Sequence, residues 1–167
     1  MPTLELHLRS IAQTDLAFLR ALYATTRADE MASTGWTQPA IDAFLAQQFD
    51  AQHRYYQEHY HDAQFSLICH RGQAIGRLYV FRGPNTLNLI DIALLPEWRR
   101  HGIGTRYLQA LTLEADESGK AIRLFVESDN PARRLYERFG FVVTGNNRVY
   151  LQMQRSASTP HAQEVPA

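Results

Sequence analysis

The sequence predicts a single α+β domain built on a mixed, mostly antiparallel central sheet of about seven strands flanked by helices. Two observations carry this prediction. Apolar, β-rich runs occupy residues 65–71, 74–81 and 87–95, and the turns between them contain Gly or Pro, as in an antiparallel meander. A helical pattern over 102–117 then separates the strand at 87–95 from another at 121–127, which is the arrangement of a right-handed βαβ unit with parallel strands.

The composition is that of an ordinary globular domain. The chain has 167 residues, 45% of them hydrophobic, with 17 Lys plus Arg against 17 Asp plus Glu. A chain of this size can bury a sizeable core, and balanced charge provides no overall field to attract nucleic acid or a membrane surface. Neither a signal-peptide pattern nor a membrane-spanning run is present in the sequence. We expect a cytoplasmic protein with one domain over 1–155 and a disordered tail over 156–167.

The remaining predicted elements extend the sheet and its covering helices. They are a strand at 4–10, helices at 14–27, 38–60 and 131–139, and two last strands at 141–145 and 148–153. Thr37 is the expected N-cap of the long helix, with Pro39 in its first turn.

The segment PEWRRHGIGTRYL, residues 96–108, joins a predicted strand to a helix N-terminus. Unpaired backbone N–H groups and the helix dipole attract anions at such a position. Gly102 and Gly104 lack Cβ atoms, so a phosphate could approach the main chain, although the turn geometry alone could also require glycine. Other phosphate loops do not fit, because Tyr107 replaces the third glycine of a dinucleotide fingerprint and no P-loop sequence occurs.

Two motifs resemble those of the GCN5-related N-acetyltransferase (GNAT) superfamily. Arg99-x-x-Gly102-x-Gly104 is similar to its Q/R-x-x-G-x-G/A acyl-CoA signature. NPARRLYERFGF, residues 130–141, is similar to its second motif, which has Asn, a helix with Leu-Tyr, and then Gly-Phe. The resemblance covers about residues 87–145 and implies a GNAT-like sheet in which the fourth and fifth strands splay apart.

The resemblance implies a site for acetyl-CoA as cosubstrate. The loop backbone would bind the pyrophosphate, and main chain at the end of the fourth strand would pair with the pantetheine. The implied cofactor-binding residues are Ile92, Ala93, Leu94, Arg99, Arg100, His101, Gly102, Ile103, Gly104, Thr105, Asn130 and Arg133. The arginines could equally be solvated surface charges, and Asn130 before Pro131 is also a good helix cap.

The resemblance also implies direct acyl transfer, without a covalent enzyme intermediate. Tyr136 is the implied general acid for the departing thiolate, although its helical spacing also suits a core aromatic. A backbone N–H at Leu94 is the implied oxyanion donor. Asp91 and Glu127 are candidate bases. In some relatives a Glu on the fourth strand is the base, and period-two alternation turns Asp91 to the opposite face unless a β-bulge intervenes. A water chain without a dedicated base is a further alternative.

Acceptor specificity is expected to come from the first two helices and the last strands. The residues predicted to line the acceptor pocket are Glu30, Trp36, Tyr56, Tyr60 and Tyr150. Their rings could hold a cationic or planar amine, or could pack in the core, and Glu30 is a further candidate base. His53, His59 and His61 lack zinc-site spacing, so no metal is expected, and Cys69 is predicted to be a core thiol.

These observations predict an acetyl-CoA-dependent N-acetyltransferase that acts on a primary amine of a small molecule or peptide. Two alternatives stay open: a non-catalytic acyl-CoA-binding sensor domain, and an O-acyltransferase. Edge strands near residues 148–153 could support a homodimer.

Overall fold

The computed structural model describes residues 4–158, which form two compact units. The N-terminal unit contains residues up to Tyr79 together with Asp91–His101, and the C-terminal unit contains Val80–Ile90 and the residues from Gly102 onward. Within the described range, no helix has the length and apolar character needed to cross a membrane, and no group of His, Cys, Asp and Glu could hold a metal ion. Most of the predicted tail, residues 159–167, lies outside the described residues.

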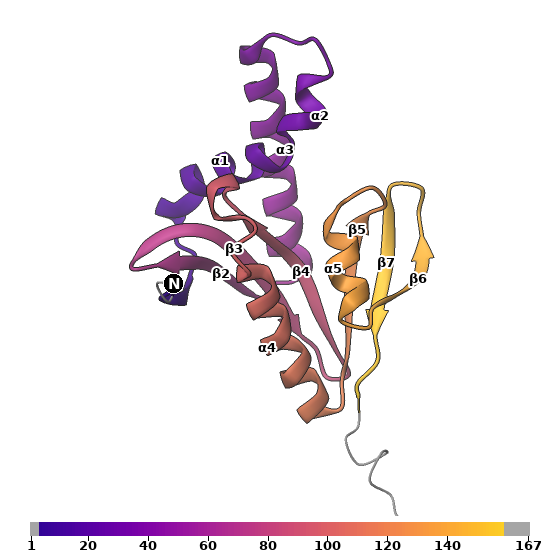
Figure 1. The fold of residues 1–167 in the computed structure, drawn as a ribbon. Helices are drawn as coiled ribbons and strands as arrows, with labels where there is room; N and C mark the ends of the chain where they lie inside the picture. The colour runs from indigo at the N-terminus through magenta and orange to yellow at the C-terminus, as the bar shows by residue number, and fades with distance from the viewer. Residues whose placement is uncertain (1–3, 159–167) are drawn as a thin grey trace, which may run out of the picture. The chain divides into compact units, whose positions relative to one another are not determined.

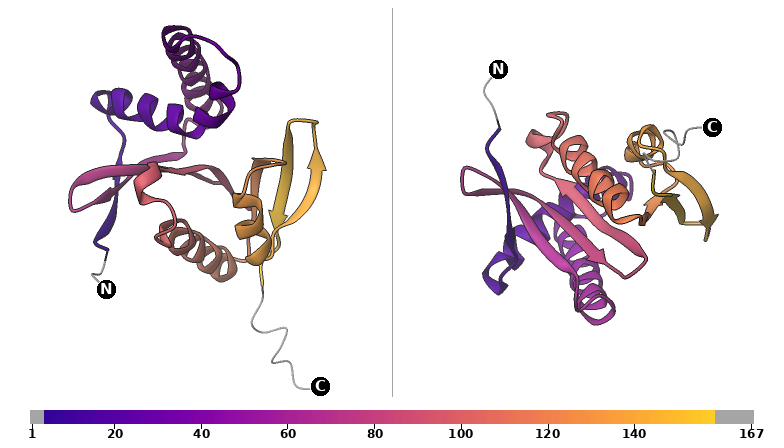
Figure 2. Two further views of the ribbon diagram at one scale, coloured as in Figure 1. Left: turned by 45° about the horizontal axis from the view of Figure 1, so that its top comes forward. Right: turned by 90° about the horizontal axis from the view of Figure 1, so that it is seen from below.

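Seven strands form a mixed sheet in the order β1-β2-β3-β4-β5-β7-β6 (Figure 1). They are β1 Leu6–Ser10, β2 Gln64–His70, β3 Gln73–Arg82, β4 Thr86–Leu94, β5 Ala121–Glu127, β6 Val142–Asn146 and β7 Tyr150–Arg155. β4 and β5 pair in parallel, which confirms the predicted βαβ unit and the α+β class. The prediction of an edge strand at 148–153 was wrong: β7 is interior, because β6 pairs along its other side (Figure 2).

Five α-helices and two short 3-10 helices complete the described chain. They are α1 Leu16–Thr26, α2 Ala28–Ala32, α3 Gln38–His59, α4 Ile103–Ser118, α5 Ala132–Arg138, η1 Gln13–Asp15 and η2 Pro96–Trp98. Thr37 caps α3 as predicted, since its Oγ1 accepts a hydrogen bond from the Ala40 N–H at 3.4 Å. The separate helix α2 was not predicted.

Each unit has buried apolar side chains of its own. In the N-terminal unit α1, α2 and α3 pack with β2 through Leu19, Tyr23, Met31, Leu45, Phe49, Leu67 and Cys69. In the C-terminal unit the buried residues of α4, β5 and β7 are Ile103, Leu108, Leu111, Thr112, Ala115, Ile122, Leu124, Val126 and Met153. The apolar stripe of α4 and the alternation in β5 therefore both face an interior, as their sequence periods require.

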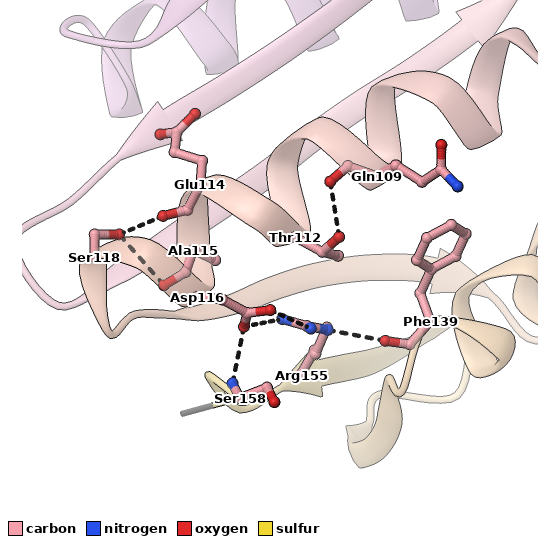
Figure 3. Close-up of polar contacts among 9 residues, drawn as sticks. All are labelled: Gln109, Thr112, Glu114, Ala115, Asp116, Ser118, Phe139, Arg155 and Ser158. Atoms are coloured by element: carbon pink, nitrogen blue, oxygen red, sulfur yellow. Dashed lines mark hydrogen bonds and ion pairs between the residues drawn. The ribbon is translucent and has the colours of Figure 1, made fainter. Parts of the chain in front are cut away.

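A polar cluster joins the end of β7 to α4 and to the end of α5 (Figure 3). The Arg155 guanidinium donates to both carboxylate oxygens of Asp116, at 2.9 and 3.0 Å, and its Nε donates to the Phe139 carbonyl at 2.9 Å. The Ser158 N–H donates to Asp116 Oδ1 at 2.8 Å. The hydrogen bonds from Arg155 hold the pKa of Asp116 below its usual value.

We predict that Asp116→Ala lowers the free energy of unfolding by about 2 kcal/mol near neutral pH, because a charge-assisted pair is lost. Because the pKa of Asp116 is lowered in the folded state, this contribution is present above the unfolded-state pKa of about 3.9 and disappears as pH falls through the folded-state value. Urea unfolding at a series of pH values should show the two proteins converging below about pH 4. The matched control is Glu117→Gln, an exposed neighbour on α4, which should leave stability unchanged. A pH-independent difference for Asp116→Ala would contradict the assignment.

Candidate active site

The loop between β4 and α4 presents main-chain donors at a helix N-terminus. Arg100 has φ 64° and Gly102 has φ 76°, so the chain turns through two left-handed residues before α4 begins. The first helical hydrogen bond runs from the Arg106 N–H to the Gly102 carbonyl, at 3.0 Å. The N–H groups of residues 103–105 therefore have no acceptor within the helix. Gly102 provides no side-chain cap for them. An anion at this end of the helix would accept hydrogen bonds from these groups.

Gly104 is not explained by the packing of the protein itself. Gly102 needs glycine for its positive φ, but Gly104 has helical geometry. A Cβ atom built at Gly104 would have one neighbour within 4 Å, Leu135 Cδ2 at 3.9 Å, which is ordinary contact. Glycine at this position therefore leaves the backbone accessible to a bound molecule.

The Arg99 side chain connects the loop to β4 and to α1, all within the N-terminal unit. Its Nε donates to the Leu94 carbonyl at 3.1 Å, and its Nη2 donates to Thr25 Oγ1 on α1 at 3.3 Å. Arg99 thus ties the loop to the end of β4, a role that the sequence motif alone does not indicate.

The other polar residues implied as cofactor ligands have varied surroundings. Arg100 and His101 are exposed, and a ring nitrogen of His101 lies 3.2 Å from the Glu97 carbonyl. In the C-terminal unit Asn130 Oδ1 accepts from the Ala132 N–H at 2.9 Å, so it serves the helix start as expected. Arg133 forms an ion pair with Glu137, one turn further along α5, at 3.0 Å.

A β-bulge lies in the β3–β4 ladder. The Gly83 N–H donates to the Thr86 carbonyl at one end, and the Leu95 N–H donates to the Ile75 carbonyl at the other. Between these two pairs β3 contributes seven residues and β4 contributes eight, so β4 carries one extra residue. This shift of register turns Asp91 to the face of β3 that carries odd-numbered residues.

The hydrogen bonding at the end of β4 also fixes the direction of the Leu94 backbone N–H and C=O groups. The Leu95 N–H points to β3, and successive residues of a strand direct their N–H groups to opposite sides. The N–H and C=O groups of Leu94 therefore point away from β3. This agrees with the hydrogen bond that the Leu94 carbonyl accepts from Arg99. Ile92, Ala93 and Leu94 are half-buried, whereas Leu87 and Leu89 earlier in the strand are buried.

Gly76 of β3 allows the end of β4 to approach closely. A Cβ atom at Gly76 would lie 2.4 Å from the Ala93 carbonyl oxygen and 2.8 Å from Leu94 Cδ2. Both contacts are too short for a real side chain, so any other residue at position 76 must displace this part of β4. Glycine inside a strand pattern signals such a close approach, and this signal was not used in the sequence analysis.

We predict that Gly76→Ala lowers the free energy of unfolding by about 1–3 kcal/mol, as overpacking of a core does. Chemical denaturation measures the loss. The control is Gly145→Ala in β6, where an added Cβ would have its nearest neighbour at 3.9 Å and stability should change by less than about 0.5 kcal/mol. Equal stability of the Gly76 variant and the wild type would show that β4 does not lie this close.

Asp91 forms a buried ion pair with Arg77 of β3. Arg77 Nε donates to Asp91 Oδ2 at 2.6 Å, Nη2 also contacts that oxygen, and Nη2 donates to Gln52 Oε1 of α3 at 3.0 Å. The guanidinium lies 4.8 Å from the centroid of the Tyr79 ring. Burial lowers the pKa of Arg77, but the charge of Asp91 and nearby tyrosines outweigh it, so the net pKa is raised and the side chain stays charged.

Two of the predicted acceptor residues lie together at the α2–α3 connection. Trp36 packs edge-on against Phe44 with ring centroids 5.4 Å apart, and the Arg27 guanidinium lies 5.9 Å from the same Phe44 ring. Arg27 forms an ion pair with Glu30 at 2.5 Å, and its hydrogen bond holds the pKa of Glu30 below the usual value. The negative charge of Glu30 is therefore paired within the chain.

The other aromatic candidates of the N-terminal unit pack along the second half of α3. The Tyr56 ring lies 6.4 Å from Tyr60 and 6.1 Å from the buried ring of Tyr79. His53 stacks on Phe49 at 5.6 Å, and burial together with the charge of Arg77 lowers the pKa of His53. This part of α3 thus faces the polar pair on β3 and β4.

The remaining candidates belong to the C-terminal unit. Tyr136 is a buried residue of α5 whose ring lies 5.7 Å from Phe141. Glu127 and Tyr150 are direct neighbours across the β5–β7 ladder, and both are exposed. The sequence did not reveal Arg77 or Gln52, because only the folded chain brings α3, β3 and β4 together.

The chain matches the model of the Acetyltransferase (GNAT) family over residues 19–141. No curated protein matches it.

Three solved structures illustrate the similarity of fold. PaiA N-acetyltransferase from Thermoplasma acidophilum, in complex with coenzyme A, is 18% identical with a TM-score of 0.69, over 91% of this chain and 99% of that chain. The ribosomal-protein-S18-alanine N-acetyltransferase from Escherichia coli is 19% identical with a TM-score of 0.61, over 93% and 96%. A chimera of spermidine N-acetyltransferase SpeG from Vibrio cholerae and hSSAT is 21% identical with a TM-score of 0.60, over 90% and 95%.

Proposed function

Since the chain belongs to the Acetyltransferase (GNAT) family, we propose that it transfers an acetyl group from acetyl-CoA to a primary amine, directly within a ternary complex. The observation that carries the proposal is the N-terminus of α4, where the N–H groups of residues 103–105 lack helical acceptors and Gly104 is bare without a structural reason. A diphosphate fits this arrangement, because it accepts several backbone hydrogen bonds and its charge is favoured by the helix dipole.

In this proposal the coenzyme is held mainly by main chain. The backbone from Arg99 to Thr105 binds the pyrophosphate, and the edge of β4 at Ile92–Leu94 binds the pantetheine. Arg99 acts by fixing the loop to Leu94, while Arg100 and His101 are exposed beside it and Asn130 with Arg133 add contacts from the start of α5. We infer no metal in this site, since the transfer needs only hydrogen-bond donors and proton transfer.

The chemical step forms a C–N bond and breaks a C–S bond. An amine with a pKa of about 10.4 must first lose a proton, and Asp91 is the carboxylate that we propose to receive it, through the oxygen that Arg77 does not occupy. Asp91 is preferred to Glu127 because it lies on the same strand as Leu94. The outward N–H of Leu94 stabilises the oxyanion of the tetrahedral intermediate, and Tyr136 donates a proton to the departing thiolate.

The acceptor is proposed to be a primary amine of a small molecule or a peptide. Relatives of similar fold act on such groups, since their names give a protein alanine and spermidine as substrates. Trp36, Tyr56 and Tyr60 are proposed to contact the acceptor from the N-terminal unit. Glu30 is a weaker candidate, because Arg27 already neutralises its charge.

The cofactor site is tested by Gly104→Val. A Cβ atom at this position makes only ordinary contact with Leu135, and we expect the melting temperature to stay within about 3 °C of the wild-type value. Coenzyme A should bind at least about tenfold more weakly in calorimetry, because the side chain enters the space proposed for the phosphates. The matched control is Ala110→Val, which places the same side chain at an exposed position of α4 and should leave affinity unchanged. Undiminished affinity of the folded Gly104 variant would refute the proposed cradle.

A further inference from the structure

Three polar side chains lie in one row across β4, β5 and β7 of the C-terminal unit. Asn88 of β4 is opposite Arg123 in the parallel pair, and Arg123 is opposite Gln154 in the antiparallel pair. Residues that are opposite one another in a ladder point to the same face of the sheet. All three are half-buried, whereas Leu89 and Leu124, the next residues along their strands, are buried on the other face. We call Asn88, Arg123 and Gln154 the polar row.

The side chains of the polar row have no partners in the part of the chain that the structure describes. Within residues 4–158, none of the three takes part in a side-chain hydrogen bond or an ion pair. The Nε of Arg123 is nevertheless buried. A buried polar atom normally has a hydrogen-bond partner, because its removal from water is otherwise unfavourable. The polar row therefore offers hydrogen-bond donors that the folded chain does not use.

The charge of Arg123 is not compensated within the described residues either. Other arginines of the C-terminal unit form ion pairs with acids: Arg82 with Glu114, Arg133 with Glu137 and Arg155 with Asp116. Glu127 is an acidic residue of the same strand as Arg123, but it lies four residues further on, about 13 Å along β5. The polar row thus combines one guanidinium charge with a carboxamide on each side.

We propose that the polar row binds the carboxylate group of a small organic acid. A guanidinium donates two parallel hydrogen bonds to one carboxylate, and carboxamides on either side can donate to the remaining lone pairs of its oxygens. One carboxylate also matches the single positive charge of Arg123. A phosphate group carries more negative charge than this row can neutralise.

Phe125 indicates which kind of acid fits. It follows Arg123 by two residues on the same face, about 7 Å along the strand, and it is 54% exposed. An aromatic ring joined to a carboxylate by a short alkyl chain can reach the Phe125 ring while its carboxylate contacts Arg123. The ligand class is therefore an aromatic monocarboxylate. Its binding does not depend on acetyl transfer, so it can be measured without acetyl-CoA.

The test is an NMR titration of the full chain with 3-phenylpropionate. The wild type should bind it with a dissociation constant of about 1 mM or lower. Three comparison ligands should each bind more weakly, the first two at least about tenfold and the third at least about threefold. They are 3-phenylpropionamide, which lacks the charge, inorganic phosphate, and propionate, which lacks the ring.

Two variants change the polar row in different ways. Arg123→Gln removes its charge, and Gln154→Glu places a carboxylate of the same side-chain length beside Arg123. Each should weaken binding of 3-phenylpropionate at least about tenfold. Gln154→Glu should also raise the melting temperature by about 2 °C, because Arg123 gains a counter-charge. The matched controls Arg138→Gln and Gln109→Glu make the same changes at exposed helical positions and should bind as the wild type does.

A wild type that does not bind 3-phenylpropionate overturns the proposal. So does a wild type that binds the amide or inorganic phosphate equally well, and equal affinity for propionate refutes the role of Phe125. A melting temperature within about 3 °C of the wild-type value shows that Arg123→Gln is folded. Wild-type affinity in folded Arg123→Gln or Gln154→Glu would place the bound acid elsewhere and contradict the assignment.

Discussion

Replacing Asp91 by alanine is expected to lower the free energy of unfolding by about 3–5 kcal/mol, because it leaves the buried guanidinium of Arg77 without its counter-charge. The side chain of Arg77 is only 4% exposed, so water cannot replace the lost carboxylate. Gln52 still accepts one hydrogen bond from Arg77, but it carries no charge.

The converse change, Arg77→Met, is expected to cost less, about 1–3 kcal/mol, because the Asp91 side chain is 26% exposed and can be hydrated. The double variant Asp91→Ala/Arg77→Met should be more stable than Asp91→Ala alone, since no buried charge remains unpaired. Urea unfolding of the three variants and the wild type gives the full cycle. Equal losses for the two single variants, or a double variant that shows their summed loss, would contradict this account of the pair.

Tyr136→Phe is expected to lower kcat for acetyl transfer by about 100-fold or more, because the variant lacks the hydroxyl proposed to protonate the thiolate. The ring is kept, so packing against Phe141 should persist and coenzyme A affinity should stay within about threefold. Steady-state thiol release gives kcat, and calorimetry gives the affinity.

The matched control for Tyr136 is Tyr55→Phe, which removes a hydroxyl from an exposed tyrosine of α3 and should leave kcat unchanged. If folded Tyr136→Phe retains the wild-type kcat, Tyr136 is not the proton donor. A loss of kcat that accompanies an equal loss in melting temperature and cofactor affinity would instead assign it a packing role.

Local sequence patterns predicted most of the fold. Apolar alternation located β2, β3 and β5, and the Thr37 cap with Pro39 placed the start of α3 within one residue. These signals succeed because they depend on the period and chemistry of neighbouring residues. The GNAT-like motifs located the loop at α4, whose geometry then showed that Gly104 has no structural role of its own.

Features that depend on distant partners escaped the sequence analysis. The position of Asp91 depends on a bulge whose presence follows from hydrogen bonds at both ends of the β3–β4 ladder. The role of Arg77 could not be predicted from its position in an apolar strand. Its partners Asp91 and Gln52 are distant in sequence and are brought beside it only by folding. The prediction of an edge strand at 148–153 was wrong, because strand order is set by pairing and not by order along the chain.

Amine-dependent release of free thiol from acetyl-CoA is the most direct test of the proposed acetyl transfer. Polyamines, peptides with free N-terminal or lysine amines, and alcohols of similar size would be compared, with products identified by mass spectrometry. We predict turnover that requires a primary amine and yields an N-acetylated product. Transfer to alcohols alone would contradict the proposal in favour of an O-acyltransferase, and tight binding of acetyl-CoA without turnover on any acceptor would contradict it in favour of a non-catalytic acyl-CoA-binding domain.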